Sequence, residues 1–287
     1  MNLRIGSRGS QLALWQANHI AALLCNEGHA VDIRIIKTTG DRLQEVTFAQ
    51  VGSKGMFTKE IEEALADGRV DLAVHSLKDL PTDLPEPFTL AVTPERIDPR
   101  DVFVSVNFEN LAALPQGARV GTSSQRRRAQ LKAVRPDIEA VEFRGNVDTR
   151  LRKLEEGEVD GLILACAGLD RIGAAGRISE RLDARIFVPA PCQGAIAIET
   201  GSGGDAAAAC APADHPPTRV AAVAERAVLT ALGGGCLMPL GAWARLEDGR
   251  LVLTAALDTG GTLRRVELAG DAAAPEELGE RVAARLR

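Results

Sequence analysis

Residues 70–81 read VDLAVHSLKDLP, a short aliphatic run that ends abruptly in polar side chains. A run of this length predicts a strand buried within a parallel sheet. Ser76, Lys78 and Asp79 then follow at the carboxyl end of that strand, where α/β sheets bind their ligands. An Asp beside a Lys can also be a solvated surface pair, and this stretch alone leaves both interpretations open.

Predicted helices and strands alternate on both sides of this stretch, which is typical of layered α/β domains. The predicted elements are a helix over Ser10–Glu27 that is capped by Ser10 and stopped by Gly28, a strand over Val31–Lys37, a helix over Thr58–Ala66, a strand at Arg119–Val120 followed by a helix, a strand over Ile138–Phe143, a helix over Val147–Glu156 and a strand over Gly161–Ala165. The segments LADGRVD at 65–71 and LEEGEVD at 154–160 form a faint repeat, which weakly supports two related halves.

The last third of the chain differs in pattern. Gly201–Pro217 is rich in Gly, Ala and Pro, which predicts a linker. A helix over Val220–Leu232 should follow, and then antiparallel strands joined by turns at Asp248-Gly249 and Gly260-Gly261. The strands are expected at 241–246, 251–258 and 263–269, before a final helix from about Pro275. This part is predicted to be a small α+β domain.

Composition narrows the class of protein. The 287 residues are 45% hydrophobic and 25% charged, which suits two or three folded domains. No stretch is long enough to span a bilayer, and the amino terminus lacks an apolar export segment, so we expect a cytoplasmic protein with no membrane partner. Five cysteines without a Cys-x-x-Cys pair and four scattered histidines predict neither a disulfide framework nor a metal site. Cys25 and Cys166 are expected to be buried apolar residues.

A second polar constellation, GTSSQRRR at 121–128, joins a strand end to a helix start. Its backbone N–H groups, the hydroxyls of Thr122, Ser123 and Ser124 and the neighbouring guanidiniums form a potential anion site. Successive arginines point in different directions on a helix, so we assign Arg126 and Arg127 to the ligand and Arg128 to solvent. A capped helix with solvated arginines remains the alternative.

A third constellation, FRGNVDTR at 143–150, repeats the strand–loop–helix pattern with Arg144, Gly145 and Arg150. The chain carries a net charge of −5, yet residues 119–152 hold eight arginines and Lys132 against four acidic residues. Guanidiniums bind carboxylates bidentately, so the segment predicts a ligand with several carboxylates.

Cys236 follows three glycines in GGGCLMP at 233–239. Glycines leave little local cover, so this thiol is expected to be more exposed and reactive than a core cysteine, although no adjacent cation stabilises its thiolate. A structural role for Cys236 stays open on this evidence. Arg8 and Ser10 form a further strand-to-helix turn that can reach an anion, a weak signal when taken alone.

Eight segments in order resemble the porphobilinogen deaminase family. They are RGSQLALWQA from Arg8, KGMFTKEIEEAL from Lys54, VDLAVHSLKDLP from Val70, GTSSQRRRAQL from Gly121, FRGNVDTRL from Phe143, LILACAGLDRIG from Leu162, PAPCQGAIAIE from Pro189 and ERAVLTALGGGCLMPLGA from Glu225. Together they cover most of the chain. The resemblance implies two α/β domains like those of periplasmic binding proteins, with a cleft between them, and a small C-terminal α+β domain. The implied boundaries are 1–95 with 194–212, 99–190 and 217–287.

The resemblance also implies a dipyrromethane cofactor, bound through a thioether to Cys236. The matching positions make Asp79 the catalytic residue. They assign cofactor binding to Lys78, Asp79, Thr122, Ser123, Ser124, Arg126, Arg127, Arg144, Gly145 and Cys236. They assign substrate binding to Arg8, Ser10, Lys54, Phe57, Ser76, Arg150 and Arg171.

The implied reaction is a transferase step of tetrapyrrole and heme biosynthesis. Four molecules of porphobilinogen join head to tail, each losing ammonia through an azafulvenium cation that a carboxylate stabilises as it forms. We expect a monomer. A non-enzymatic two-lobed anion-binding protein is the main alternative, although it leaves residues 233–236 without a use. A nucleic-acid binder fits less well, because acidic residues dominate and only 3% of residues are aromatic.

Overall fold

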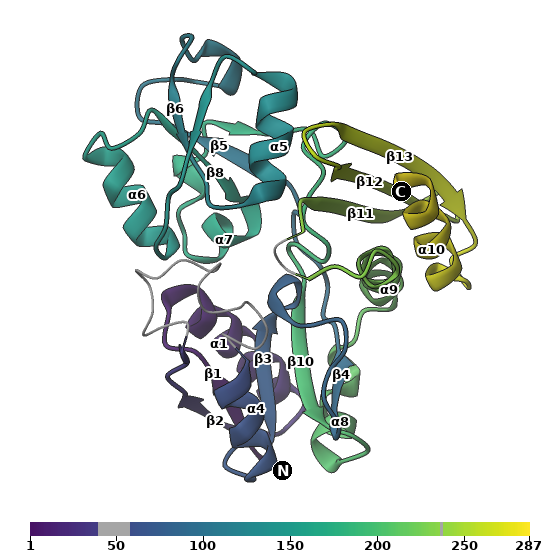
Figure 1. The fold of residues 1–287 in the computed structure, drawn as a ribbon. Coiled ribbons are helices and arrows are strands. Elements are labelled where there is room, and N and C mark those ends of the chain that lie inside the picture. Colours follow the sequence, from purple (N-terminus) through teal and green to yellow (C-terminus); the bar gives the residue numbers. More distant parts are fainter. Residues whose placement is uncertain (40–57, 236–237) are drawn as a thin grey trace. The chain divides into compact units, whose positions relative to one another are not determined.

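The computed structural model describes residues 1–39, 58–235 and 238–287, which form two compact units (Figure 1). Unit 1 comprises Met1–Ile97 and Ala195–Arg219, and unit 2 comprises Asp98–Gly194 and Val220–Arg287. Within the described ranges, no helix combines the length and apolarity that crossing a membrane requires.

Unit 1 is built on a mixed five-stranded sheet. Its strands, in spatial order, are β2 (Ala30–Ile35), β1 (Asn2–Ser7), β3 (Leu72–Ser76), β10 (Ile196–Gly201) and β4 (Phe88–Val92). Strand β1 runs parallel to β2 and β3, whereas β10 runs antiparallel to β3 and β4. The predicted strand of the opening stretch therefore exists, starts two residues later than expected, and has a parallel neighbour on one side only.

Helices α1 (Gln11–Asn26) and α4 (Lys59–Ala66) pack on the two faces of the sheet of unit 1. Helix α1 packs Ala17, Ile20 and Leu24 against a core that includes Leu3 and Ile5 of β1. Helix α4 covers the opposite face, since a Cβ placed on Gly6 would lie 3.3 Å from Ile61 of this helix. The alternation of side chains along β1 thus separates the two packing faces.

Unit 2 repeats this arrangement. Its five-stranded sheet has the order β7 (Glu139–Val141), β6 (Arg119–Gly121), β8 (Gly161–Ala165), β5 (Asp101–Val104) and β9 (Glu180–Arg181). Strand β6 is parallel to β7 and β8, and β5 is antiparallel to β8. Helices α5 (Gln125–Val134), α6 (Val147–Glu155) and α7 (Cys166–Arg171) connect the strands. Separate hydrophobic clusters hold Leu131 of α5 and Leu151 of α6.

The faint sequence repeat corresponds to equivalent places in the two sheets. Gly68 follows α4 and precedes β3, and Gly157 follows α6 and precedes β8, each with a positive φ (64° and 79°). Strands β3 and β8 both occupy the third position of their sheets. The expectation of two related halves is therefore confirmed.

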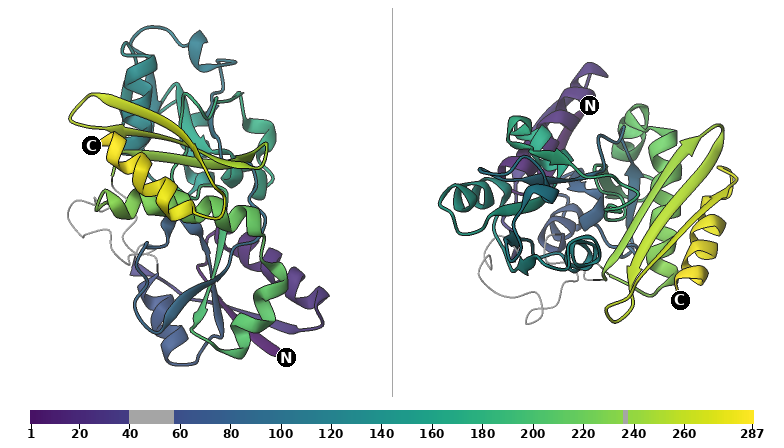
Figure 2. Two further views of the ribbon diagram at one scale, coloured as in Figure 1. Left: turned by 90° about the vertical axis from the view of Figure 1, so that its right-hand side faces the viewer. Right: turned by 90° about the horizontal axis from the view of Figure 1, so that it is seen from above.

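The C-terminal part forms the predicted antiparallel meander. Its elements are β11 (Leu240–Glu247), β12 (Arg250–Asp258), β13 (Leu263–Gly270), α9 (Pro216–Ala231) and α10 (Pro275–Leu286). Helices α9 and α10 cover one face of this sheet (Figure 2), where Val228, Leu253 and Val282 are completely buried. The α/β class with a small C-terminal α+β part is thus confirmed. Because residues 220–287 cluster with Asp98–Gly194, the division into three domains remains a prediction.

Two expectations were wrong. Residues 201–217 are not a plain linker, because they form helix α8 (Asp205–Cys210), a short 3-10 helix and the start of α9. Alanine is the best helix former, and Ala209 and Cys210 join the core of unit 1. Cys25 is exposed, because it lies one position past Leu24 on α1 and so points about 100° away from the buried face. Cys166 is buried as expected.

Candidate functional site

The carboxyl end of β3 presents Asp79 on a short, well-anchored turn. Strand β3 ends at Ser76, and Leu77–Asp79 form a single turn of 3-10 helix. Leu77 and Leu80 are buried on either side of the exposed Asp79, and the Leu77 N–H donates to Ala195 O at 3.0 Å. The apolar residues of the motif therefore hold the backbone, and the carboxylate stays accessible.

The turn after β1 places Arg8 and Ser10 at the same edge of the sheet, since β1 and β3 are parallel neighbours. Ser10 is the N-cap of α1, as predicted, and accepts a hydrogen bond from Ala13 N at 3.3 Å. From the same helix, the buried Gln16 donates through Nε2 to Ser76 Oγ at 2.9 Å. Arg8, Ser10 and Ser76 therefore lie at one edge of the sheet, and the bond from Gln16 ties Ser76 to helix α1.

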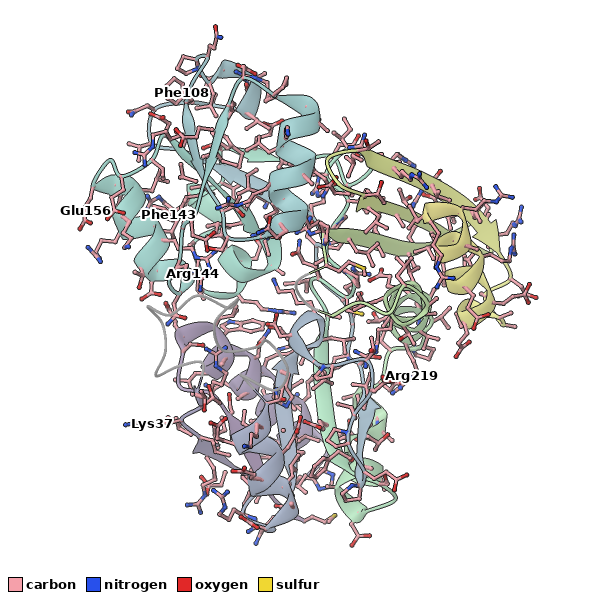
Figure 3. The ribbon with its side chains drawn as sticks, in the orientation of Figure 1. Lys37, Phe108, Phe143, Arg144, Glu156 and Arg219 are labelled. Carbon is pink, nitrogen blue, oxygen red and sulfur yellow. The ribbon has the colours of Figure 1, made fainter. Side chains whose placement is uncertain are left out.

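In unit 2, the loops after β6 and β7 meet at the carboxyl edge of the parallel strands. Ser123 Oγ donates to Phe143 O at 2.6 Å, which ties the two loops together. Phe143 and the adjacent Arg144 lead into α6 and are labelled in Figure 3. Ser124 is the N-cap of α5 and accepts from Arg127 N at 3.4 Å. The two strand–loop–helix motifs found in the sequence therefore form one edge.

Two of the arginines predicted to bind ligand carboxylates, Arg126 and Arg127, are bound to a carboxylate of the chain itself. Arg126 Nη1 lies 2.6 Å from Asp101 Oδ2, and Arg127 Nη2 lies 2.8 Å from Asp101 Oδ1. Burial alone would raise the pKa of Asp101, but the charges of Arg126 and Arg127 hold that pKa well below its usual range. Asp101 is a neighbour of Arg126 and Arg127 that the sequence did not reveal, because it lies 25 residues upstream of Arg126.

Arg128 was expected to face solvent; its side chain is partly exposed, at 27%, but it also binds other residues of the protein. Its Nε donates to Thr122 O at 3.1 Å, and its Nη2 lies 2.8 Å from Glu142 Oε2. Glu142 also accepts from Arg144 Nε at 2.8 Å. Arg128 and Glu142 thus brace the loops after β6 and β7, a role that depends on tertiary contacts.

At this edge Arg150 is half-buried and Arg171 is buried. Arg150 Nε donates to Gly145 O at 2.7 Å, and Arg171 Nη2 donates to Gly194 O at 2.7 Å. Burial and, to a smaller extent, the charge of Arg127 lower the pKa of Arg150 to about 10. Glu142 raises this pKa, and Arg144 lowers it further. Burial lowers the pKa of Arg171 to about 10. Both remain charged at neutral pH, and a nearby anion would stabilise them.

Gly145 is required by the shape of this loop. Its φ is +121°, and a Cβ at this position would lie 2.9 Å from Thr149. Only glycine suits such a backbone at so close a contact.

The predicted residues Lys54, Phe57 and Cys236 lie outside the described residues. Of the segment before Cys236, Gly233 follows α9 with a φ of +67°.

Comparisons with known proteins agree with the geometry. Residues 3–209 match the family model of the porphobilinogen deaminase dipyrromethane cofactor binding domain, and residues 220–287 match that of the porphobilinogen deaminase C-terminal domain. Porphobilinogen deaminase of Syntrophomonas wolfei is 51% identical over 87% of this chain and 83% of the relative. That of Albidiferax ferrireducens is 49% identical over 99% and 93%.

Among solved structures, a periplasmic substrate-binding protein of an ABC transporter from Coxiella burnetii aligns with 78% of this chain and 96% of its own. The identity is 14% and the TM-score 0.46. The family models span nearly the whole chain and the curated relatives share about half of its residues, so the chain belongs to the porphobilinogen deaminase family.

Proposed function

We propose that this chain condenses four porphobilinogen molecules head to tail, with loss of ammonia, into the linear tetrapyrrole hydroxymethylbilane. Porphobilinogen is a pyrrole with one acetate and one propionate side chain, so every addition brings two carboxylates. The observation that carries the proposal is the enclosed set of cations in unit 2, where burial and like charges lower the pKa of Arg150 to about 10. Such a site favours a polyanionic ligand.

The described residues fit a dipyrromethane cofactor. Two linked pyrroles carry four carboxylates, and the edge of unit 2 offers hydroxyls, backbone N–H groups and guanidiniums of matching chemistry. We assign the cofactor to Lys78, Asp79, Thr122, Ser123, Ser124, Arg126, Arg127, Arg144 and Gly145, with its covalent link at Cys236. Once bound, the cofactor supplies the pyrrole carbon from which the chain grows.

Asp79 is the proposed catalytic residue. Its exposed carboxylate can accept hydrogen bonds from pyrrole N–H groups and stabilise the positive charge that develops on the substrate as ammonia leaves. The same carboxylate can move protons at deamination and at rearomatisation. The anchored turn at Leu77–Asp79 fixes the backbone from which the carboxylate projects.

The remaining assigned residues would hold the carboxylates of the substrate and the growing chain. They are Arg8, Ser10, Lys54, Phe57, Ser76, Arg150 and Arg171.

We further propose that the protein works as a monomer in the cytoplasm, without metal, nucleic-acid or membrane partners. Light scattering after size exclusion tests the oligomeric state, and a dimer mass at micromolar concentration would contradict this proposal.

Intact mass spectrometry tests the function directly. The purified chain should exceed its sequence mass by a two-pyrrole adduct, and Cys236→Ser should remove the adduct together with porphobilinogen consumption. Cys25→Ser is the matched control, because Cys25 is an exposed thiol on a helix and should leave the adduct in place. A wild-type chain that carries no pyrrole and consumes no porphobilinogen, even with a preformed primer, would overturn the proposal.

A further inference from the structure

Asp101 is completely buried at the start of β5 and accepts hydrogen bonds from three side chains. Arg126 and Arg127, which are 4% and 7% exposed, reach it from the first turn of α5. Arg126 donates through Nη1 at 2.6 Å and Nη2 at 3.2 Å. Arg127 donates through Nε at 3.1 Å and Nη2 at 2.8 Å. Gln193 Nε2 adds a bond at 2.9 Å.

Each guanidinium also donates a hydrogen bond to a backbone carbonyl, in addition to its bonds with Asp101. Arg126 Nη1 also donates to Val188 O at 2.7 Å, and Arg127 Nη1 donates to Ile163 O at 3.0 Å. A guanidinium has five N–H donors in one plane, so three or four such bonds determine its orientation. The N–H groups of each guanidinium that do not take part in these bonds therefore point in a fixed direction.

Helix geometry explains why a shared acceptor is needed. Neighbouring residues on a helix point about 100° apart, so Arg126 and Arg127 would not converge through local structure alone. A single carboxylate between them draws both side chains to one place. It also offsets one of the two buried positive charges, and the cluster retains a net charge of about +1 for an anionic ligand.

The side chain of Gln193 in turn binds the carboxylate of Asp101. Its Nε2 lies 2.9 Å from Asp101 Oδ1 and 2.8 Å from Pro99 O, and its Oε1 lies 3.5 Å from Arg127 Nη2. Its side chain therefore links residues near the start of unit 2 to those near Gly194, where the first segment of this unit ends.

We propose that Asp101 is a positioning residue for cofactor loading: it aims Arg126 and Arg127 at the carboxylates of the dipyrromethane group, and Gln193 orients Asp101. The inference rests on the proposed function. It differs from that function in assigning a role to a carboxylate that is itself enclosed by protein and that binds Arg126, Arg127 and Gln193.

The test measures how fast apo-protein gains a covalent pyrrole adduct, followed by intact mass after addition of hydroxymethylbilane. Asp101→Asn keeps the shape but removes the acceptor charge, and the loading rate should fall about tenfold or more, as expected when hydrogen bonds between charged groups are lost. Asp101→Glu restores the charge and should recover part of the rate. Asp98→Asn is the matched control, because Asp98 pairs with Arg100 at 2.6 Å and does not contact Arg126 or Arg127.

Gln193→Met covers the case in which Asp101→Asn does not fold. It removes only the bonds of the amide, and loading should slow about threefold, the loss expected for one neutral hydrogen bond. A folded Asp101→Asn chain, judged by circular dichroism, that loads at the wild-type rate would overturn the inference, as would wild-type loading by Gln193→Met. If the wild-type chain itself gains no adduct, the proposed function fails instead.

Discussion

Asp79 combines exposure with a rigid backbone. The side chain is open to solvent, while Leu77 and Leu80 are 0% and 3% exposed on either side. A preoriented charge stabilises a developing cation better than a mobile one, because it need not reorganise during the reaction. The short spacing of polar and apolar residues in this motif therefore has a direct chemical use.

Replacing Asp79 tests this use. Asp79→Asn preserves the size of the side chain and removes its charge, so turnover should fall about 10²–10³-fold, the typical loss when one electrostatic stabiliser is removed. Steady-state consumption of porphobilinogen measures the change, and intact mass shows whether the cofactor is still present. Asp83→Asn alters an exposed carboxylate four residues away and should leave turnover unchanged. Near-normal turnover of Asp79→Asn would remove Asp79 from the centre of the mechanism.

The arginines of unit 2 divide into two kinds. Arg126 and Arg127 have an internal carboxylate partner in Asp101. Arg150 instead donates to a backbone carbonyl, and burial with neighbouring like charges lowers its pKa to about 10. The sequence predicted that arginines gather here, because their spacing after two strands is local information. It did not predict the partners of Arg126, Arg127 and Arg128, because Asp101 and Glu142 reach these three arginines only through the folded sheet.

At the level of elements, local signals predicted well. The Ser10 cap began α1 where expected, and β8 matched Gly161–Ala165 residue for residue. Asp248 and Gly249 take positive φ values of 48° and 76°, as a tight hairpin turn requires. The composition of the Ala-rich segment after Gly201 predicted a linker, but this segment forms helix α8 because its side chains pack into the core of unit 1. Strand β10 also pairs antiparallel between β3 and β4, a placement that no local pattern could indicate.

The end of β6 sets a strict packing limit. A Cβ on Gly121 would lie 2.7 Å from Leu162 and 2.8 Å from Phe143, both in the core beneath the loops that follow β6 and β7. Gly121→Ala should therefore lower the free energy of unfolding by about 1–3 kcal/mol through overpacking. Urea unfolding monitored by circular dichroism measures it. Gly176→Ala is the control, because a Cβ there meets nothing within 4 Å. Equal effects of the two substitutions would contradict this packing account.

For the molecule as a whole, both units place their polar residues by the same topology. Each sheet has three parallel strands followed by an antiparallel fourth, and the site residues follow the carboxyl ends of the parallel ones. The proposed residues differ in chemistry between the units, since Asp79 and Lys78 belong to unit 1, whereas most of the proposed arginines belong to unit 2. A chain of net charge −5 can thus offer a strongly cationic site, because its positive charge is concentrated in one segment.

That concentration of charge predicts a link between occupancy and stability. In Cys236→Ser, which lacks the cofactor, inorganic phosphate should bind near Arg150 and raise the thermal midpoint, because it offsets charges that burial and Arg127 destabilise. At ten times its Kd the gain is about 1.4 kcal/mol, which is a few degrees for a chain of this size. Cofactor-loaded protein should gain less at equal ionic strength. Arg150→Gln should reduce the gain of the apo form, whereas Arg152→Gln, exposed on the same helix, should not. Equal gains in loaded and apo protein would show that phosphate acts elsewhere.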